Sequence, residues 1–193
     1  MENEERIHKH DARRILAHQL GFTETLNYSF YSAEDFTKCG LQEMGHIRVK
    51  NALSSEQTHM RMSLVPGVLK NIAKNNRERK NMKLFEIGRT YKEAGEFMPF
   101  EEKWIVGAVA QPVKEGEIFY TLKGALEAFL EKFRTPNVLL REAHTPHTYA
   151  HPKKTVEIVV RGETIGYAFT LHPAVSRAFQ LESDVALFEL NFT

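Results

Sequence analysis

The sequence predicts an α+β fold in which a mainly antiparallel sheet is flanked by helices. Two observations carry this prediction: strand-like runs rich in β-branched and aromatic residues are joined by hairpin signals, and amphipathic helices are inserted between them. Such an order indicates an antiparallel sheet with helices packed on one side. No repeat or Pro/Ser-rich linker divides the chain, so we expect a single domain over residues 1–193.

The N-terminal part predicts a helix followed by a strand. Apolar residues recur at helical spacing over residues 11–20, with the first residue as the cap and Gly21 as the stop. Residues 22–30 alternate as in a strand. A short helical or irregular connection and a brief strand over residues 46–53 then lead to a helix with Pro66 in its first turn.

The remaining segments predict five or more strands and one clear helix. The helix covers residues 122–133, where apolar residues form one broad face. The run at 102–111 is almost continuously apolar, which indicates burial on both faces or in the middle of a sheet. The expected strands are residues 82–91, 102–111, 137–143, 155–162, 164–170 and 185–192, with a tight hairpin at "RGE".

Composition excludes several classes of protein. Twenty-six basic and 25 acidic residues leave a formal charge of +1, so no overall field attracts nucleic acid or an anionic membrane. Cys39 is the only cysteine, which excludes an internal disulfide and a Cys-built zinc site and suits a reducing cytoplasm. The N-terminus is charged, unlike a signal peptide, and no apolar run reaches the roughly 18 residues that span a bilayer.

Motifs of common catalytic sites are absent from the sequence. No two of the 11 glycines are two positions apart, so dinucleotide and related glycine-rich loops are excluded, and the P-loop signature is missing. His144, His147 and His151 lie within eight residues, and imidazoles at such spacing can share a zinc ion. Pro146 and Pro152 make this segment a loop, and the alternative is that the histidines bind no metal.

One local cluster is basic. Arg77, Arg79 and Lys80 follow Lys74 in the stretch "KNNRERKN" and can meet the phosphate of RNA or of a nucleotide. No aromatic residue lies among them to stack on a base, so a solvated turn is the alternative.

Six pieces of the chain occur in an order that resembles one family. They are "RILAHQLGFTETLNYSF", "NALSSEQTHMRMSLVPGVLKNIAKNN", "LFEIGRTY", "HPKK", "IGYAFTLHP" and "FEL". Together they resemble the catalytic-like core domain of the β subunit of bacterial phenylalanyl-tRNA synthetase. Ala52 replaces a usual proline, and "HPKKTV" replaces the commoner "HPGRSA". Within these pieces, the residues that match the family's motifs and that we expect to have structural roles are Arg61, Pro66, Gly67, Glu86, Gly88, His151, Pro152, His172 and Pro173.

The resemblance implies a fold and a set of partners. The fold is that of a class II aminoacyl-tRNA synthetase core, and the domain is an inactive relative of the catalytic α chain, against which it packs in a tetramer of two α and two β chains. ATP and Mg²⁺ belong to the α subunit of the holoenzyme, so we expect no cofactor here. tRNA(Phe) binds the holoenzyme, the location is cytoplasmic, and this chain is a fragment of a longer β chain.

The resemblance also identifies what is missing. A class II site clamps ATP with one arginine after the strand of its second motif and another in a glycine-rich third motif, because the transferred charge must meet fixed, bidentate cations. Lys92 follows "GRTY" here, and no Gly-x-Gly-x-x-Arg occurs. A lysine offers a point charge without the guanidinium fork. We therefore expect no catalytic residues in this chain.

In class II enzymes the first motif builds the contact between subunits. The matching residues predict an interface at Arg14, Leu26, Tyr28 and Phe30. Two other functions stay open: a stand-alone class II synthetase-like paralogue that binds ATP, and a tRNA-contacting module that uses Arg77, Arg79 and Lys80.

Overall fold

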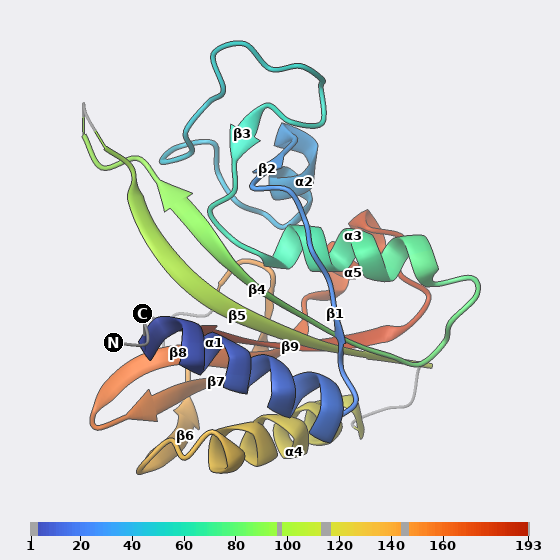
Figure 1. Ribbon diagram of the computed structural model, residues 1–193. Coiled ribbons are helices and arrows are strands. Elements are labelled where there is room, and N and C mark those ends of the chain that lie inside the picture. The colour runs from blue at the N-terminus through green and yellow to red at the C-terminus, as the bar shows by residue number, and fades with distance from the viewer. Residues whose placement is uncertain (1–3, 96–97, 113–116, 144–146, 193) are drawn as a thin grey trace.

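A seven-stranded sheet organises the chain. The computed structural model describes residues 4–95, 98–112, 117–143 and 147–192. The strands lie in the order β1-β4-β5-β9-β8-β7-β6, and neighbours are antiparallel except for the parallel pair β1–β4. Their bounds are β1 Thr23–Glu24, β4 Met82–Lys92, β5 Phe100–Gln111, β6 Val138–Glu142, β7 Ala150–Val160, β8 Glu163–Leu171 and β9 Asp184–Asn191 (Figure 1). The mainly antiparallel α+β prediction is confirmed.

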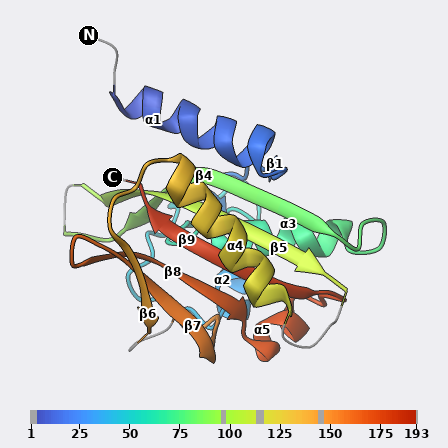
Figure 2. The ribbon, with the colours of Figure 1, turned by 90° about the horizontal axis from the view of Figure 1, so that it is seen from below.

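Helices cover both faces of this sheet, not one face as the sequence suggested. Figure 2 shows α1 and α4 on the near face and α3 beyond the sheet. The cause is the apolar run of β5, which sends Val106 and Ala108 into one core and Ile105 and Val109 into the other. The helices are α1 (Glu4–Arg13), α3 (Val65–Asn75), α4 (Glu117–Lys132) and α5 (Pro173–Ala178).

The long elements appear where they were predicted, although α4 begins at Glu117 and not at residue 122, and β7 begins at Ala150 and not at residue 155. α3 begins with Pro66 in its first turn, and α4 buries Leu126 and Phe129 to about 1% exposure or less. The β7–β8 hairpin turns at Arg161 and Gly162, whose φ angles are 52° and 87°. Two successive positive φ angles are typical of the mirror-image turns that match strand twist.

The first helix begins earlier than predicted. α1 starts at Glu4, and its last turns, η1 (Arg14–Gln19), are π-helical. Asp11 is therefore inside the helix and is not its cap. The polar upstream turns are held by the ion pair between Glu5 and Lys103 and by an edge contact of His8 with Phe133, which sequence periodicity does not reveal. The chain does turn at Gly21, with φ of 71°.

Two predicted strands are wrong in detail. The stretch 22–30 is not one strand: β1 joins the large sheet, and β2 (Phe30–Tyr31) pairs with β3 (His59–Met60) in a separate two-stranded sheet beside α2 (Ala33–Lys38). Residues 46–53 form only a single bridge, between Arg48 and His59. Residues 22–30 are held by the side-chain contact of Asn27 with Glu86, and residues 46–53 by backbone hydrogen bonds to the stretch 58–60.

Candidate functional site

A buried ion pair anchors the segment between β1 and β2. The Arg61 Nη1 atom donates to the Glu86 Oε1 atom at 2.6 Å, and the two side chains are only 8% and 2% exposed. Arg61 also donates to the backbone carbonyl of Arg89, while Glu86 accepts from the Asn27 Nδ2 atom at 2.7 Å. The longer contacts of the same guanidinium reach the carbonyls of Asn27 and Tyr28. One guanidinium thus joins β4 to the extended segment.

Two glycines make room for this cluster. A Cβ atom on Gly88 would lie 2.3 Å from the Arg61 Nη2 atom, and one on Gly67 would lie 3.0 Å from the Asn27 Nδ2 atom. Side chains at these positions would displace the arginine or the asparagine. Of the residues that resemble family signatures, Arg61, Gly67 and Glu86 contact Asn27. Gly88 makes room for the guanidinium of Arg61.

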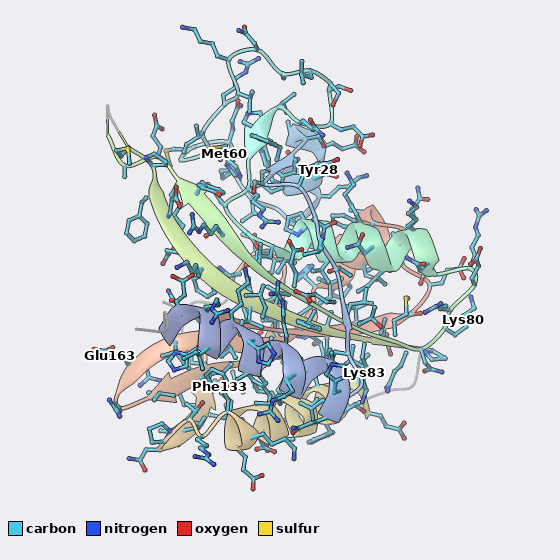
Figure 3. The ribbon with its side chains drawn as sticks, in the orientation of Figure 1. Tyr28, Met60, Lys80, Lys83, Phe133 and Glu163 are labelled. Atoms are coloured by element: carbon cyan, nitrogen blue, oxygen red, sulfur yellow. The ribbon has the colours of Figure 1, made fainter. Side chains whose placement is uncertain are left out.

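The anchored segment presents a row of apolar side chains outward. Leu26, Tyr28 and Phe30 are 81%, 76% and 38% exposed, while Asn27 between them points inward. Figure 3 shows Tyr28 on this segment, between α2 and the large sheet. We call Leu26, Tyr28 and Phe30 the exposed row. Arg14, the fourth predicted interface residue, lies apart on η1, and its Nη2 atom is 3.6 Å from the Asp11 Oδ1 atom.

The cation at the expected clamp position is paired within the chain. The Lys92 Nζ atom donates to the Glu102 Oε2 atom at 2.9 Å, and the Glu102 Oε1 atom accepts from the Asn191 Nδ2 atom at 3.3 Å. Lys92 is the last residue of β4, Glu102 lies near the start of β5, and Asn191 is the last residue of β9. Their side chains therefore lie together at one end of the sheet, on the face that α3 covers. The charge that a phosphate would need is already neutralised there.

Side chains of the chain itself fill the neighbouring part of that face. Tyr149 donates its hydroxyl to the Glu189 Oε1 atom at 2.7 Å, and the ring of His147 stacks on Tyr149 with centroids 5.0 Å apart. Burial raises the pKa of Glu189 to about 7, against the hydrogen bonds from Tyr149 and Ser63, which lower it. Burial and the charge of Lys92 lower the pKa of His147. Tyr149 and Glu189 are buried, whereas the His147 side chain is 40% exposed.

The predicted histidine loop is wrong in part, because β7 begins at Ala150 and includes His151 and Pro152. His144 lies outside the described residues, and no group of three or more potential ligands that could hold a metal ion occurs in the described ranges. The Nδ1 atom of His151 accepts from the backbone N–H of Lys153, one residue after the exposed Pro152. In the same way the Nδ1 atom of His172 accepts from Ala174 and caps α5, with Pro173 in its first turn.

The single cysteine is also structural in character. Cys39 is completely buried, and burial raises the pKa of its thiol, which keeps it neutral. Its backbone carbonyl accepts from the Thr148 hydroxyl at 2.9 Å. This contact ties the end of α2 to the loop that carries His147 and Tyr149.

The basic loop after α3 divides into two parts. The Lys80 Nζ atom is 2.7 Å from the Glu182 Oε2 atom, and Arg77 contributes to the electrostatic environment of the same carboxylate. Arg79 instead lines a cavity of about 410 Å³ together with Lys83. All three predicted residues are exposed, and the structure does not gather them in one site.

The fold places the chain in a known structural class. Two solved pyrrolysyl-tRNA synthetase structures from Desulfitobacterium hafniense superpose with TM-scores of 0.77 and 0.78 at 13% and 14% identity. They cover 96% and 97% of this chain, which covers 65% and 66% of them. The fold is that of a class II aminoacyl-tRNA synthetase core.

Sequence comparison then identifies the family. The model of the family described as "Phenylalanyl tRNA synthetase beta chain CLM domain" matches residues 1–192, and the chain belongs to this family. It is 32% identical over 188 residues to the phenylalanine–tRNA ligase β subunit of Carboxydothermus hydrogenoformans, and 31% identical over 191 residues to that of Solibacter usitatus. These matches cover 90% and 97% of the chain but 23% and 24% of the relatives, so the chain spans about a quarter of their length.

Proposed function

We propose that this chain is the non-catalytic, class II-like core domain of a phenylalanine–tRNA ligase β subunit and that it packs against the α subunit. The exposed row carries the proposal. Leu26 and Tyr28 lie on an anchored segment, yet both side chains are largely exposed to solvent. Exposed apolar side chains that lie together indicate a surface that a partner covers. Stable, permanent interfaces bury about 2,000 Å² or more around an apolar centre, and the exposed row supplies such a centre.

The lack of catalysis is the second part of the proposal. Lys92 occupies the clamp position but is held by Glu102, and the adjoining face is filled by Tyr149 and His147. A nucleotide would have to break the Lys92–Glu102 contact and displace these rings. ATP and Mg²⁺ are therefore assigned to the α subunit, which would attach phenylalanine to tRNA(Phe).

The wider setting follows from the family. We propose that residues 1–193 are one domain of a longer β chain in a cytoplasmic tetramer of two α and two β chains, which meets tRNA(Phe) as a whole. The seven-stranded sheet supports the single domain, since it draws strands from both ends of the chain. In the described residues, no helix is both long and apolar enough to cross a membrane.

Two measurements test the proposal. The chain is mixed with a cognate α subunit, and complex formation and phenylalanylation of tRNA(Phe) are followed. Separately, the chain alone is assayed for phenylalanine-dependent ATP–pyrophosphate exchange. We expect a complex in the first experiment and only background in the second. Exchange by the chain alone that a phenylalanyl-adenylate analogue inhibits would favour the stand-alone paralogue instead.

A further inference from the structure

A cavity of about 1000 Å³ opens near the β6 edge of the large sheet. Small-molecule sites in proteins have volumes of about 300–1,000 Å³. Residues of α4, α5 and the four strands β6 to β9 line this cavity, and in Figure 2 α5 lies next to one end of α4. The exposed row follows β1, which is the opposite edge of the sheet, so the cavity does not overlap the proposed subunit contact.

A buried hydroxyl without a partner belongs to the wall of this cavity. Thr170 on β8 lines the cavity and is only 8% exposed. Its Oγ1 atom has no hydrogen-bond partner among the described residues. A buried polar group that makes no hydrogen bond costs about 1–3 kcal/mol. A polar ligand in the cavity would supply the missing partner.

The pairing of β7 with β8 is interrupted at the same place. Between Ala150 and Thr155, four residues of β7 lie opposite the single residue Thr170 of β8. The hydroxyl of Thr155 donates to the carbonyl of His151 at 2.6 Å and closes this bulge. Bulges redirect side chains and are frequent next to functional sites. This one brings two lysines to the cavity.

Three cations line the cavity and are exposed: Lys153 and Lys154 on the bulge, and Arg177 on α5. We call them the three rim cations. None of them forms an ion pair with a described residue, whereas Arg141 in the same lining lies 2.7 Å from the Glu157 carboxylate. Cations that surround a concave surface and lack carboxylate partners attract an anion, and phosphate is well suited to them.

Two carboxylates also line the cavity, and they narrow the class of ligand. Glu142 on β6 and Asp184 on β9 form no ion pair with a described residue. An ionised carboxylate only accepts hydrogen bonds, so the ligand has to donate to it. The three rim cations would repel an ammonium group but not a neutral hydroxyl. A ligand that carries both an anionic group and hydroxyl groups therefore fits this lining.

The first turns of α4 add an apolar surface. Phe119 and Tyr120 line the cavity, and their ring centroids are 6.3 Å apart. The Tyr120 side chain is 73% exposed. Aromatic rings offer a large apolar area, and the C–H face of a sugar ring can pack on it while its hydroxyl groups point elsewhere.

We propose that this cavity binds a sugar phosphate. The phosphate lies at the three rim cations, and the sugar hydroxyls bond to the two carboxylates and to the Thr170 hydroxyl. This ligand differs from the amino acid, the ATP and the tRNA that the proposed function assigns to the holoenzyme. The proposal does not rest on that function, because every residue it uses belongs to this chain and lies outside the exposed row.

The first test titrates the chain with glucose 6-phosphate, fructose 6-phosphate and ribose 5-phosphate, followed by calorimetry. The cation variant is Lys154→Gln with Arg177→Gln. The matched control is Lys132→Gln with Arg79→Gln, which removes the same charges from exposed positions outside this lining. We expect at least one of the three compounds to bind, the cation variant to bind it about tenfold or more weakly, and the control to be unchanged.

The variant Thr170→Val distinguishes a ligand-binding hydroxyl from a structural one. It should bind the sugar phosphate about fivefold more weakly, yet melt at the same or a higher temperature, because the hydroxyl has no described partner to lose. Thr90→Val is the matched control, since its hydroxyl is also buried and without a described partner but does not line this cavity. It should leave binding unchanged. A lower melting temperature with unchanged affinity for Thr170→Val would overturn the proposal.

Comparison ligands test the chemical class. Inorganic phosphate and glucose should each bind at least about tenfold more weakly than the best sugar phosphate, and phenylalanine, a zwitterion, should not compete. Binding of none of the three sugar phosphates, equal binding of inorganic phosphate, equal weakening in the control, or displacement by phenylalanine would each contradict the proposal. If a variant fails to fold, NMR of the unaltered chain decides: the methyl signal of Thr170 must shift on addition of the sugar phosphate and that of Thr90 must not.

Discussion

The guanidinium of Arg61 and the carboxylate of Glu86 form a buried ion pair, 2.6 Å apart, that holds an exposed segment in place. The two side chains are only 8% and 2% exposed, and Asn27 and backbone carbonyls also hydrogen-bond to the pair. Buried pairs of this kind favour a specific geometry only when their other donors and acceptors are satisfied. Here that geometry fixes the direction in which Leu26 and Tyr28 point.

Removing one partner of this pair should be costly. Arg61→Met leaves Glu86 buried without its cation, and we expect a loss of about 3–5 kcal/mol in the free energy of unfolding. Arg89→Met breaks the exposed pair with Glu101 and should cost no more than about 1 kcal/mol. Urea denaturation of the two variants measures the difference. The second substitution Glu86→Gln should restore part of the stability of Arg61→Met, and equal losses in the two single variants would contradict the account.

Two glycines should respond in opposite directions to alanine. Gly88→Ala brings a Cβ atom against Arg61 and should destabilise the chain by about 1–3 kcal/mol. Gly124→Ala lies on the exposed side of α4, where a Cβ atom meets nothing within 4 Å, and should stabilise it by up to about 1 kcal/mol. Thermal melting of both variants checks the signs. A higher melting temperature for Gly88→Ala would show that Arg61 moves aside at little cost.

The buried carboxyl of Glu189 should make stability depend on pH. Its pKa is raised by burial from 4.5 to about 7, so the folded chain keeps a proton that the unfolded chain releases across this interval. Stability from this group is therefore present at low pH and lost as pH rises from about 4.5 to about 7, by roughly 3 kcal/mol at about 1.4 kcal/mol per pKa unit. Glu189→Gln should remove that loss, so the variant should melt above the parent at pH 8.

The nearby imidazole moves stability in the other direction. The pKa of His147 is lower in the folded chain than in the unfolded chain, so the unfolded chain takes up a proton at higher pH. The folded chain therefore loses stability as pH falls below the ordinary imidazole pKa of 6.5. Comparing the parent with Glu189→Gln at each pH reports on the carboxyl together with its coupling to His147, whose Nε2 atom lies 3.9 Å from the Glu189 Oε1 atom. Glu163→Gln at the exposed β7–β8 hairpin is the matched control (Figure 3). Parallel pH profiles for the parent and Glu189→Gln would show that Glu189 has no raised pKa.

Periodicity predicted the elements that bury a continuous face. The apolar runs of β4, β5, β8 and β9 and the stripe of α4 appear where the sequence indicated, because burial in a sheet or helix repeats at a fixed interval. The predicted one-sided packing was wrong, although the double-faced burial of β5 was visible in its composition. The upstream turns of α1 and the shape of residues 22–30 depend on contacts with distant partners, such as Glu5 with Lys103 and Asn27 with Glu86.

The candidate site was predictable only in part. Family resemblance selected Arg61, Glu86 and Gly88 but gave no reason for them, and the structure supplies the reason by bringing them together. The cluster of Tyr149 with Glu189 was missed, because its members lie forty residues apart and neither has a local signal. A glutamate in the otherwise apolar strand "VALFELN" was the one available indication.

The most direct test of the proposed subunit contact is the affinity of this chain for a cognate α subunit, measured by calorimetry. The exposed-row variant is Leu26→Asp with Tyr28→Asp. Its control, Leu139→Asp with Tyr120→Asp, changes the same residue types at positions that are 58% and 73% exposed on β6 and α4. We expect the exposed-row variant to bind at least about thirtyfold more weakly, as for an interface hot spot, and both variants to melt cooperatively. Unchanged affinity of the exposed-row variant, or an equal loss in the control, would place the contact elsewhere and contradict the account.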